Sequence, residues 1–503
     1  MHQKVFFAEK GYMSIVKADN LKVSYVVVFL AAAALYIATC APGAVWQDSG
    51  MYQYRIWHND IEGKLGLALS HPLYHIIGIA VKYIPIGEFG YRINLISAIA
   101  GAFAVANLFL LLRLWLKDIF AAAMAAVTLA LSHTMWWHAV IAEDYTLYTA
   151  LLLTELIMLL QYVKTKQLIF LYLLGLFNGL AIATHMFASI AFICYLVFLV
   201  VLLVKKQIHL KNIGIVAVLW VAGAAPYEYL IIKMYIETGD FAGTLASAMF
   251  GNSWQGDVFN TSVSAKLIKE NLILIAYNFS TFNGLFFFAG LYGLKKIVPS
   301  RSFKNILLAL MTGFFVFAFR YTVPDRYTFF MPFYCIGSVI GGAGFNLFIT
   351  QANRRTLRWI VCFLAVLPIP TYIIAPIVAE KIRYDLPTRK NISYRDDYIW
   401  FLRPWRPGYH GPENFAAEVF SKLGPGAVVY ADNTMVYSLL YLQEVKGKRK
   451  DLKIISGITS SANTTSLCEK PIESWLLEGD VFTVSPVAGY KFKNNGIVWK
   501  ITR

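Results

Sequence analysis

Long apolar stretches recur through the first three quarters of this 503-residue chain, and they restrict its fold more than any other feature. A helix needs about 20 predominantly apolar residues to cross the hydrocarbon core of a bilayer. Eleven stretches approach that length, near residues 22–40, 94–112, 119–135, 145–163, 168–184, 186–204, 213–233, 271–292, 305–320, 327–349 and 357–379. The sequence therefore predicts a polytopic α-helical membrane protein with about 11 transmembrane helices.

The composition supports this class, because 58% of the residues are hydrophobic, only 15% are charged, and the mean hydropathy is +0.56. The first apolar stretch follows a Lys-rich tail and lacks a small-residue cleavage site. We therefore expect a membrane anchor and not a removed signal peptide. The five cysteines are scattered and form no CxxC spacing, so the sequence predicts neither a disulfide framework nor a cysteine metal site.

The distribution of Lys and Arg predicts the orientation. With the N-terminus in the cytoplasm, the inner segments carry 18 Lys and Arg against three acidic residues. The outer turn at 133–144 contains no Lys or Arg at all. Because cytoplasmic loops of membrane proteins are enriched in cations, we expect a multi-pass protein of the cytoplasmic (inner) membrane with an extracytoplasmic C-terminus. This topology accounts for the net charge of +16, so we expect no nucleic-acid partner.

The pattern predicts two domains. Residues 1–379 form the transmembrane domain, with long outer loops at about 41–93 and 234–270. Residues 380–503 contain more Pro, Gly and charged residues and predict a small extracytoplasmic α/β domain. We expect its strands at 426–432 and 451–455, a helix at 437–443, and a last hairpin between 476 and 490.

Two acidic residues lie at the predicted outer surface. Asp48 follows the first apolar stretch, and Glu143 lies between the third and the fourth. Paired carboxylates at one membrane surface suit an enzyme that holds a base beside a membrane-borne substrate. Asp144 directly follows Glu143 and either points into the same site or caps the helix that begins at Tyr145.

A succession of motifs in the first half of the chain resembles the protein O-mannosyltransferase-like membrane family, within the GT-C class of glycosyltransferases. The resemblance covers residues 22–205 well, is weaker in the later stretches, and returns at 424–429 and 441–445. Its motifs are Gln47-Asp48-Ser49-Gly50, Ser70-His71-Pro72-Leu73-Tyr74, Tyr91-Arg92-Ile93-Asn94, Ala142-Glu143-Asp144-Tyr145-Thr146-Leu147 and Ala183-Thr184-His185.

The resemblance implies a GT-C-like fold and an inverting transferase that takes a sugar, such as mannose, from a polyprenyl-phosphate donor. The acceptor hydroxyl would belong to Ser or Thr of exported proteins, on the outer face of the membrane. Asp48 matches the family's first-loop acid, the expected general base, and Glu143 is expected near the acceptor or the base. The family usually has an apolar residue where this chain has Asp144, which leaves open which acid enters the site.

The remaining candidate residues would bind substrate. His71, His185, Asp144 and Tyr145 are candidates for contact with the acceptor or the donor.

The departing phosphate gains negative charge, and an outer arginine can stabilise it with a bidentate guanidinium. Arg92, Arg320 and Arg326 are the candidates, although arginines at helix ends also reach to headgroups and Asp325 can pair with Arg326. We expect no metal-ligand set and no cofactor beyond the lipid-linked donor, and the need for a divalent ion stays open.

Three alternatives remain. The same chemistry can act on a lipid or a surface glycan as acceptor. A transporter or flippase suits many apolar stretches, but the halves show no repeat and the acids lie at the membrane surface. A non-catalytic scaffold predicts that the substitution Asp48→Asn has no effect in any assay.

Overall fold

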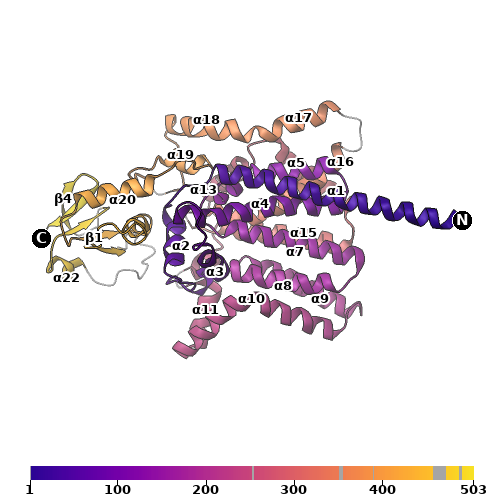
Figure 1. The fold of residues 1–503 in the computed structure, drawn as a ribbon, viewed down its shortest axis with the longest axis horizontal. Coiled ribbons are helices and arrows are strands. Elements are labelled where there is room, and N and C mark those ends of the chain that lie inside the picture. Colours follow the sequence, from indigo (N-terminus) through magenta and orange to yellow (C-terminus); the bar gives the residue numbers. More distant parts are fainter. Residues whose placement is uncertain are drawn as a thin grey trace.

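The computed structural model describes residues 2–251, 254–323, 325–349, 355–388, 390–456, 472–485 and 490–502. Long helices run roughly side by side along the long axis of the molecule (Figure 1). The N-terminus lies at one end of this helical bundle, and a small sheet lies at the other. The predicted helical membrane domain and C-terminal α/β part are therefore both present.

Seven helical segments in the described residues are long and apolar enough to cross a membrane, and two bent helix pairs raise the number to nine. The predicted total of eleven is reached only with α8 (Ile169–Thr184) and α9 (Ala188–Val204), which are shorter at 16 and 17 residues. The helices of the seven segments are α1 (His2–Ala38), α4 (Phe89–Leu116), α7 (Tyr145–Thr165), α10 (Leu210–Thr238), α15 (Arg301–Arg320), η3 (Thr328–Phe330) with α16 (Met331–Ile349), and α17 (Arg355–Val366) with α18 (Pro368–Lys381).

Two predicted spans are broken helices. The segment α5 (Ile119–Ala130) continues after a 65° bend as α6 (His133–Ala139). The segment α13 (Ala265–Asn278) continues after a 110° bend as η2 (Phe282–Leu285) and α14 (Phe286–Ile297). Hydropathy measures only the apolar length of a segment, so the sequence pattern did not reveal either bend.

Short helices build the loops at the end of the bundle near the sheet. The first predicted loop contains α2 (Gln47–Trp57), η1 (Leu67–Leu69) and α3 (Pro72–Val81), and the second contains α11 (Phe241–Phe250) and α12 (Gln255–Val258). In Figure 1, α2 and α3 lie between the long helices and the C-terminal sheet. The first loop is thus folded against both parts of the molecule.

The C-terminal part combines five short helices with a five-stranded sheet of order β2-β1-β3-β5-β4. Strand β1 pairs in parallel with β2 and β3, whereas β5 pairs antiparallel with β3 and β4. The elements are α19 (Asp397–Leu402), α20 (Gly411–Lys422), β1 (Val428–Ala431), α21 (Val436–Leu440), the π-helical turn η4 (Tyr441–Val445), β2 (Lys453–Ser456), α22 (Ile472–Leu476), β3 (Val481–Thr483), β4 (Lys491–Asn495) and β5 (Val498–Thr502).

The two predicted strands at 426–432 and 451–455 are confirmed as β1 and β2, but the position of the hairpin was wrong. The hairpin joins β4 to β5 and turns at residues 496–497, where Gly496 has a positive φ of 76°. Glycine adopts this conformation without steric cost, which places the turn there. Strand β3 instead lies inside the sheet between β1 and β5, and residues 486–489 of the predicted hairpin lie outside the described residues.

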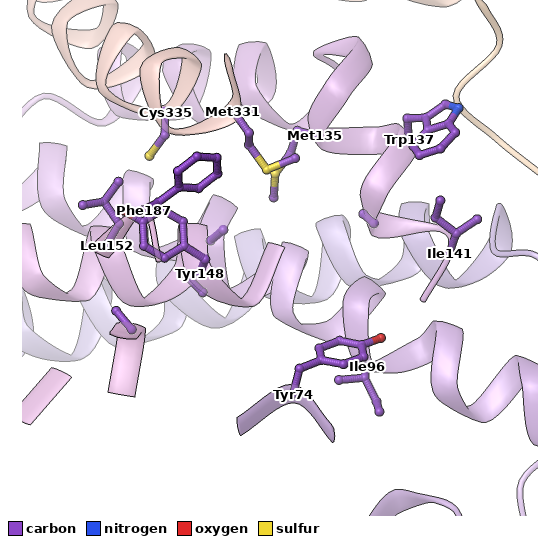
Figure 2. Packing of buried hydrophobic residues seen from close by; sticks show 14 of the residues in the cluster. Tyr74, Ile96, Met135, Trp137, Ile141, Tyr148, Leu152, Phe187, Met331 and Cys335 are labelled. Carbon is purple, nitrogen blue, oxygen red and sulfur yellow. The ribbon is translucent and has the colours of Figure 1, made fainter. Parts of the chain in front are cut away.

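Aromatic and sulfur-containing side chains fill the core between the helices. Figure 2 shows Tyr148 and Phe187 beside Cys335 and Leu152, with Tyr74 and Ile96 packed in the same cluster. The Tyr148 and Phe187 rings lie 5.7 Å apart. These contacts join α3, α4, α7 and α16, so the loop end of the bundle has a fixed shape.

Helices α8 and α10 approach each other so closely that a glycine is required. A Cβ added at Gly223 would lie 2.3 Å from the Leu176 carbonyl oxygen and 2.8 Å from the Leu180 nitrogen. Both neighbours are backbone atoms, which cannot move away as a side chain can. Small residues commonly permit such contacts between membrane helices.

We expect the substitution Gly223→Ala to destabilise the protein by about 1–3 kcal/mol, because the extra methyl forces α8 and α10 apart. The thermal midpoint of the purified protein in detergent measures this effect. Gly214→Ala is the matched control in the same helix, since nothing lies within 4 Å of a Cβ at Gly214. An equal fall of the thermal midpoint in Gly223→Ala and Gly214→Ala would contradict the requirement for a glycine where α8 and α10 meet.

Candidate active site

The predicted acids face a cavity of about 480 Å³ at the loop end of the bundle. Asp48, Glu143 and Asp325 contribute carboxyl groups to its wall, and His71 and His185 contribute imidazoles. Another cavity, of about 520 Å³, is lined mainly by Phe side chains and has no ionisable side chain in its wall. The chemistry therefore points to the first cavity, which we call the acidic cavity.

Asp48 enters the acidic cavity from the first turn of α2. Helix α2 starts after Trp46, and Gln47 has a left-handed φ of 56° that turns the chain into the helix. A carboxylate in the first turn is favoured by the free N–H groups of the helix. Asp48 is exposed to the cavity. The next residue, Ser49, is buried.

Glu143 is held beside Asp48 by hydrogen bonds from two serines. The Ser49 hydroxyl donates to Oε1 of Glu143 at 2.7 Å. The Ser97 hydroxyl on α4 donates to the Glu143 carbonyl oxygen at 2.7 Å and accepts from its N–H at 3.0 Å. The prediction that Asp48 and Glu143 lie at one site thus agrees with their common place in the cavity wall, and their catalytic roles stay a prediction.

Asp325 is a third acid in this wall, and the sequence analysis did not single it out as a site residue. Its expected partner Arg326 instead makes an ion pair with Glu270 and donates to Asn271 at 3.1 Å. Asp325 therefore faces the cavity without that guanidinium. The sequence offered only a weak signal for it, an acidic residue in the short segment between two apolar helices with no motif around it.

The three acids influence one another's protonation. Burial raises the pKa of Glu143 well above its ordinary value, and the charge of Asp48 raises it further. Burial raises the pKa of Asp325 to about 7, again with a contribution from Asp48. Burial also raises the pKa of Asp48 despite the opposing charge of His71. Groups with raised pKa values are suited to proton transfer near neutral pH.

Asp144 is turned away from its neighbour Glu143 and contacts His71. The side chain of Asp144 is fully buried, and its Oδ2 lies 2.9 Å from Nδ1 of His71. It occupies the N-cap position of α7 but makes no capping hydrogen bond with its side chain. Burial is the largest single effect and raises the pKa of Asp144, but the charge and the hydrogen bond of His71 together with smaller contributions lower the pKa below its ordinary value.

Two histidine rings are stacked at the cavity wall. His71 has a left-handed φ of 47° just before α3, and its ring centroid lies 5.0 Å from that of His185. His185 follows α8 and stacks on Phe187 at 4.0 Å, with the Tyr145 ring 5.2 Å away. All four predicted substrate-binding residues, Asp144, Tyr145, His71 and His185, are therefore neighbours, although Asp144 does not line the cavity.

His71, Asp144 and His185 also have ligand atoms within 4.8 Å of one another, a spacing that a metal ion can use. Their hydrogen bonds favour a different arrangement. Nδ1 of His71 lies 2.8 Å from the Thr184 carbonyl oxygen, so it carries a proton. Nδ1 of His185 accepts from the Phe187 N–H at 3.1 Å, so a neutral His185 carries its proton on Nε2. With these tautomers, a neutral His71 keeps its free lone pair on Nε2, whereas the Nδ1 lone pair of His185 is already used by the Phe187 N–H.

The three predicted phosphate-binding arginines are absent from the described wall of the acidic cavity. Arg92 donates to the carbonyl oxygens of Lys82 and Ile84 and thereby fixes the end of α3. Arg320 donates to the Asn260 carbonyl oxygen at 2.7 Å. Each arginine thus has a local partner, and contact with phosphate remains a prediction for all three.

We expect the substitution Glu143→Gln to increase stability relative to the wild type as pH rises. Because the pKa of Glu143 is higher in the folded than in the unfolded protein, folding takes up a proton above about pH 4.5. This favourable contribution is lost as pH rises through the folded pKa, by at most about 1.4 kcal/mol per pH unit. Glutamine does not ionise and can still accept the bond from Ser49.

Thermal midpoints in detergent between about pH 5 and about pH 8 measure this difference. Glu237→Gln is the control, because Glu237 is exposed near the end of α10 and its ion pair in the described structure is with Lys233. A difference in thermal midpoint between Glu143→Gln and the wild type that stays constant with pH would contradict the raised pKa of Glu143.

Known proteins share both a domain and the fold with this chain. Residues 69–210 match a family model described as the protein O-mannosyl-transferase TMEM260 N-terminal domain. The apo structure of ArnT from Cupriavidus metallidurans is similar over 96% of this chain and 98% of ArnT, at 12% identity and a TM-score of 0.64. The same enzyme bound to undecaprenyl phosphate gives the same coverage at 13% identity and a TM-score of 0.61.

A more distant structure has the same architecture. The Archaeoglobus fulgidus oligosaccharyltransferase in complex with zinc and sulfate is similar over 91% of this chain and 67% of its own, at 15% identity and a TM-score of 0.50. At these identities the likeness establishes the fold. Residues 69–210 are therefore similar to the N-terminal domain of a protein O-mannosyl-transferase, and this multi-pass membrane chain has the GT-C fold that ArnT also has.

Proposed function

We propose that this protein transfers a sugar, a hexose such as mannose, from a polyprenyl-phosphate donor to an acceptor hydroxyl on the outer face of the membrane. The observation that carries the proposal is the convergence of Asp48 and Glu143 from separate loops in the wall of one cavity. Acids that raise one another's pKa values in a cavity wall are typical of functional sites. The acceptor we propose is Ser or Thr of exported proteins, in line with the family match at 69–210.

The proposed reaction is a direct displacement at C1 of the sugar. The acceptor oxygen forms the new bond to C1, and the bond from C1 to the phosphate oxygen breaks with its electron pair. Asp48 takes the acceptor proton as general base, and Glu143 positions the acceptor beside it. A single displacement on the face opposite the phosphate inverts the configuration at C1.

The walls of the acidic cavity suit a donor with one polar and one apolar end. The wall carries the three acids, while Phe187, Ile190, Met249 and Phe317 supply apolar surface. An isoprenoid chain can lie against such an apolar surface as readily as against lipid tails, without exposure to water. The sugar phosphate would then be presented to the acids at the loop end.

The proposed orientation places this end outside the cytoplasm. The acidic cavity and the C-terminal sheet belong to the end of the bundle opposite the N-terminus (Figure 1). The excess of Lys and Arg in the segments predicted to be inside supports an N-terminus in the cytoplasm. Exported acceptors would then approach between the loops and the C-terminal part.

We expect the substitution Asp48→Asn to lower the rate of sugar transfer by about 10²- to 10⁴-fold, because the acceptor loses its general base. The assay uses purified protein in lipid vesicles, a radiolabelled polyprenyl-phosphate-mannose donor and a mixture of exported proteins. Donor binding should stay close to that of the wild type, since asparagine keeps the shape of the side chain.

Asp480→Asn is the matched control, because Asp480 is an exposed acid that pairs with Lys500 on the distant sheet. Equal transfer by wild type and Asp48→Asn would remove Asp48 from the mechanism. If the radiolabelled sugar appears in a lipid or polysaccharide fraction while the proteins stay unmodified, the result would support the same chemistry on another acceptor.

A further inference from the structure

The departing phosphate needs a positive partner, but the acidic cavity lacks the usual ones. Among the described residues that line it, none is Lys or Arg. The undescribed residues nearest to these in sequence, Asn252, Ser253 and Pro324, are uncharged. The ionised groups of this wall are instead carboxylates, which would repel a phosphate. Among the described residues of the wall, the histidines are therefore the side chains that can supply a positive charge.

Only one of the two histidines in this wall is placed to carry charge. Burial lowers the pKa of His185 to about 3, and its Nδ1 already accepts a hydrogen bond from the Phe187 N–H. A second proton on His185 would remove that hydrogen bond. His185 therefore remains neutral, and His71 is the remaining candidate.

His71 has the geometry of an imidazolium held by a carboxylate. Its Nδ1–H donates to the Thr184 carbonyl oxygen at 2.8 Å, and Oδ2 of Asp144 lies 2.9 Å from the same nitrogen. Within the described part of the chain, His71 is the one cationic side chain that pairs with Asp144, and no other side-chain hydrogen bond satisfies the Asp144 oxygens. Nε2 of His71 makes no hydrogen bond within the described structure, although the residue lines the cavity.

We propose that His71, with its charge stabilised by Asp144, binds the phosphate group of the lipid-linked donor through Nε2–H. The inference rests on the proposed function and specifies which group recognises the phosphate. As C1 leaves the phosphate, negative charge grows on the phosphate oxygens, and the donated hydrogen bond from Nε2 becomes stronger. The proton stays on His71, so no further reactant is required.

Asp144 then has a role distinct from that of Glu143. Glu143 faces the acceptor side of the acidic cavity and bonds to Ser49, whereas Asp144 is fully buried behind His71. A buried carboxylate behind an imidazole fixes both its orientation and its charge. Two adjacent acids in the sequence therefore serve the two substrates separately.

The test measures binding of undecaprenyl phosphate, without a sugar, to the full-length protein in lipid nanodiscs. Undecaprenol, which has the same chain but no phosphate, measures the contribution of the chain alone. We expect His71→Gln and Asp144→Asn each to weaken binding of undecaprenyl phosphate by about tenfold or more, and to leave undecaprenol binding unchanged. His410→Gln, at an exposed residue of the C-terminal part, is the control.

A second variant separates phosphate binding from a structural role. His71→Lys restores a cation beside Asp144 and should recover part of the lost affinity for undecaprenyl phosphate. If His71 has only a structural role, His71→Lys should bind undecaprenyl phosphate no better than His71→Gln, because lysine is longer and cannot stack on His185.

Equal affinity of wild type and His71→Gln would overturn the role of His71 and leave the proposed transferase intact. Wild-type protein that binds undecaprenyl phosphate no better than undecaprenol would overturn both proposals.

Discussion

Two polar side chains on α4, Asn94 and Ser97, hold the candidate site together. Both are fully buried, and a buried polar group is costly unless it is hydrogen-bonded. Asn94 donates to the carbonyl oxygens of Ala41 and Gly43, which fixes the start of the first loop. Ser97 exchanges two hydrogen bonds with the backbone of Glu143, which fixes the other acid-bearing turn. One rigid helix thus sets the distance between the two loops.

The acids in this cavity work against the stability of the fold. Asp48, Glu143 and Asp325 line one cavity, and desolvation in the cavity wall raises the pKa of each above its ordinary value. Ionising all three would bring like charges close together in a poorly solvated place. The hydrogen bond from Ser49 to Glu143 offsets only part of this cost. Such an arrangement is typical of a functional site, where a substrate proton or hydroxyl relieves the repulsion.

The sequence predicted the helical segments and the two principal acids for clear physical reasons. Each predicted stretch coincides with an apolar helix or bent pair, because the bilayer imposes an apolar length that is visible in the residues. Asp48 and Glu143 were visible because each follows an apolar helix in a matching motif. Asp325 could not be recognised as a site residue from the sequence, since no motif marks it and its neighbour Arg326 offered an apparent partner.

The contacts of the histidines and arginines could not be predicted from the sequence. His71 reaches Asp144 only because its backbone is left-handed, a tertiary feature without a local signal. Arg92 has the sequence position of a phosphate ligand, yet its guanidinium satisfies carbonyl groups at the end of α3. An arginine near a helix end has several possible partners within reach, and the fold decides among them.

The C-terminal part is packed against the first loop, which carries Asp48, and therefore supports the candidate site. The N–H of Gln47, directly before Asp48, donates to the Thr434 carbonyl oxygen at 3.2 Å. A Cβ added at Gly50 would lie 3.0 Å from Cβ of Tyr437, so α2 and α21 touch closely at this glycine. The first turn of α2 is thus fixed from one side by the C-terminal part and from the other by Glu143. If Asp48 is the general base, as we propose, a carboxylate on a turn held in this way loses little freedom when the acceptor binds, which is the physical advantage of preorganisation.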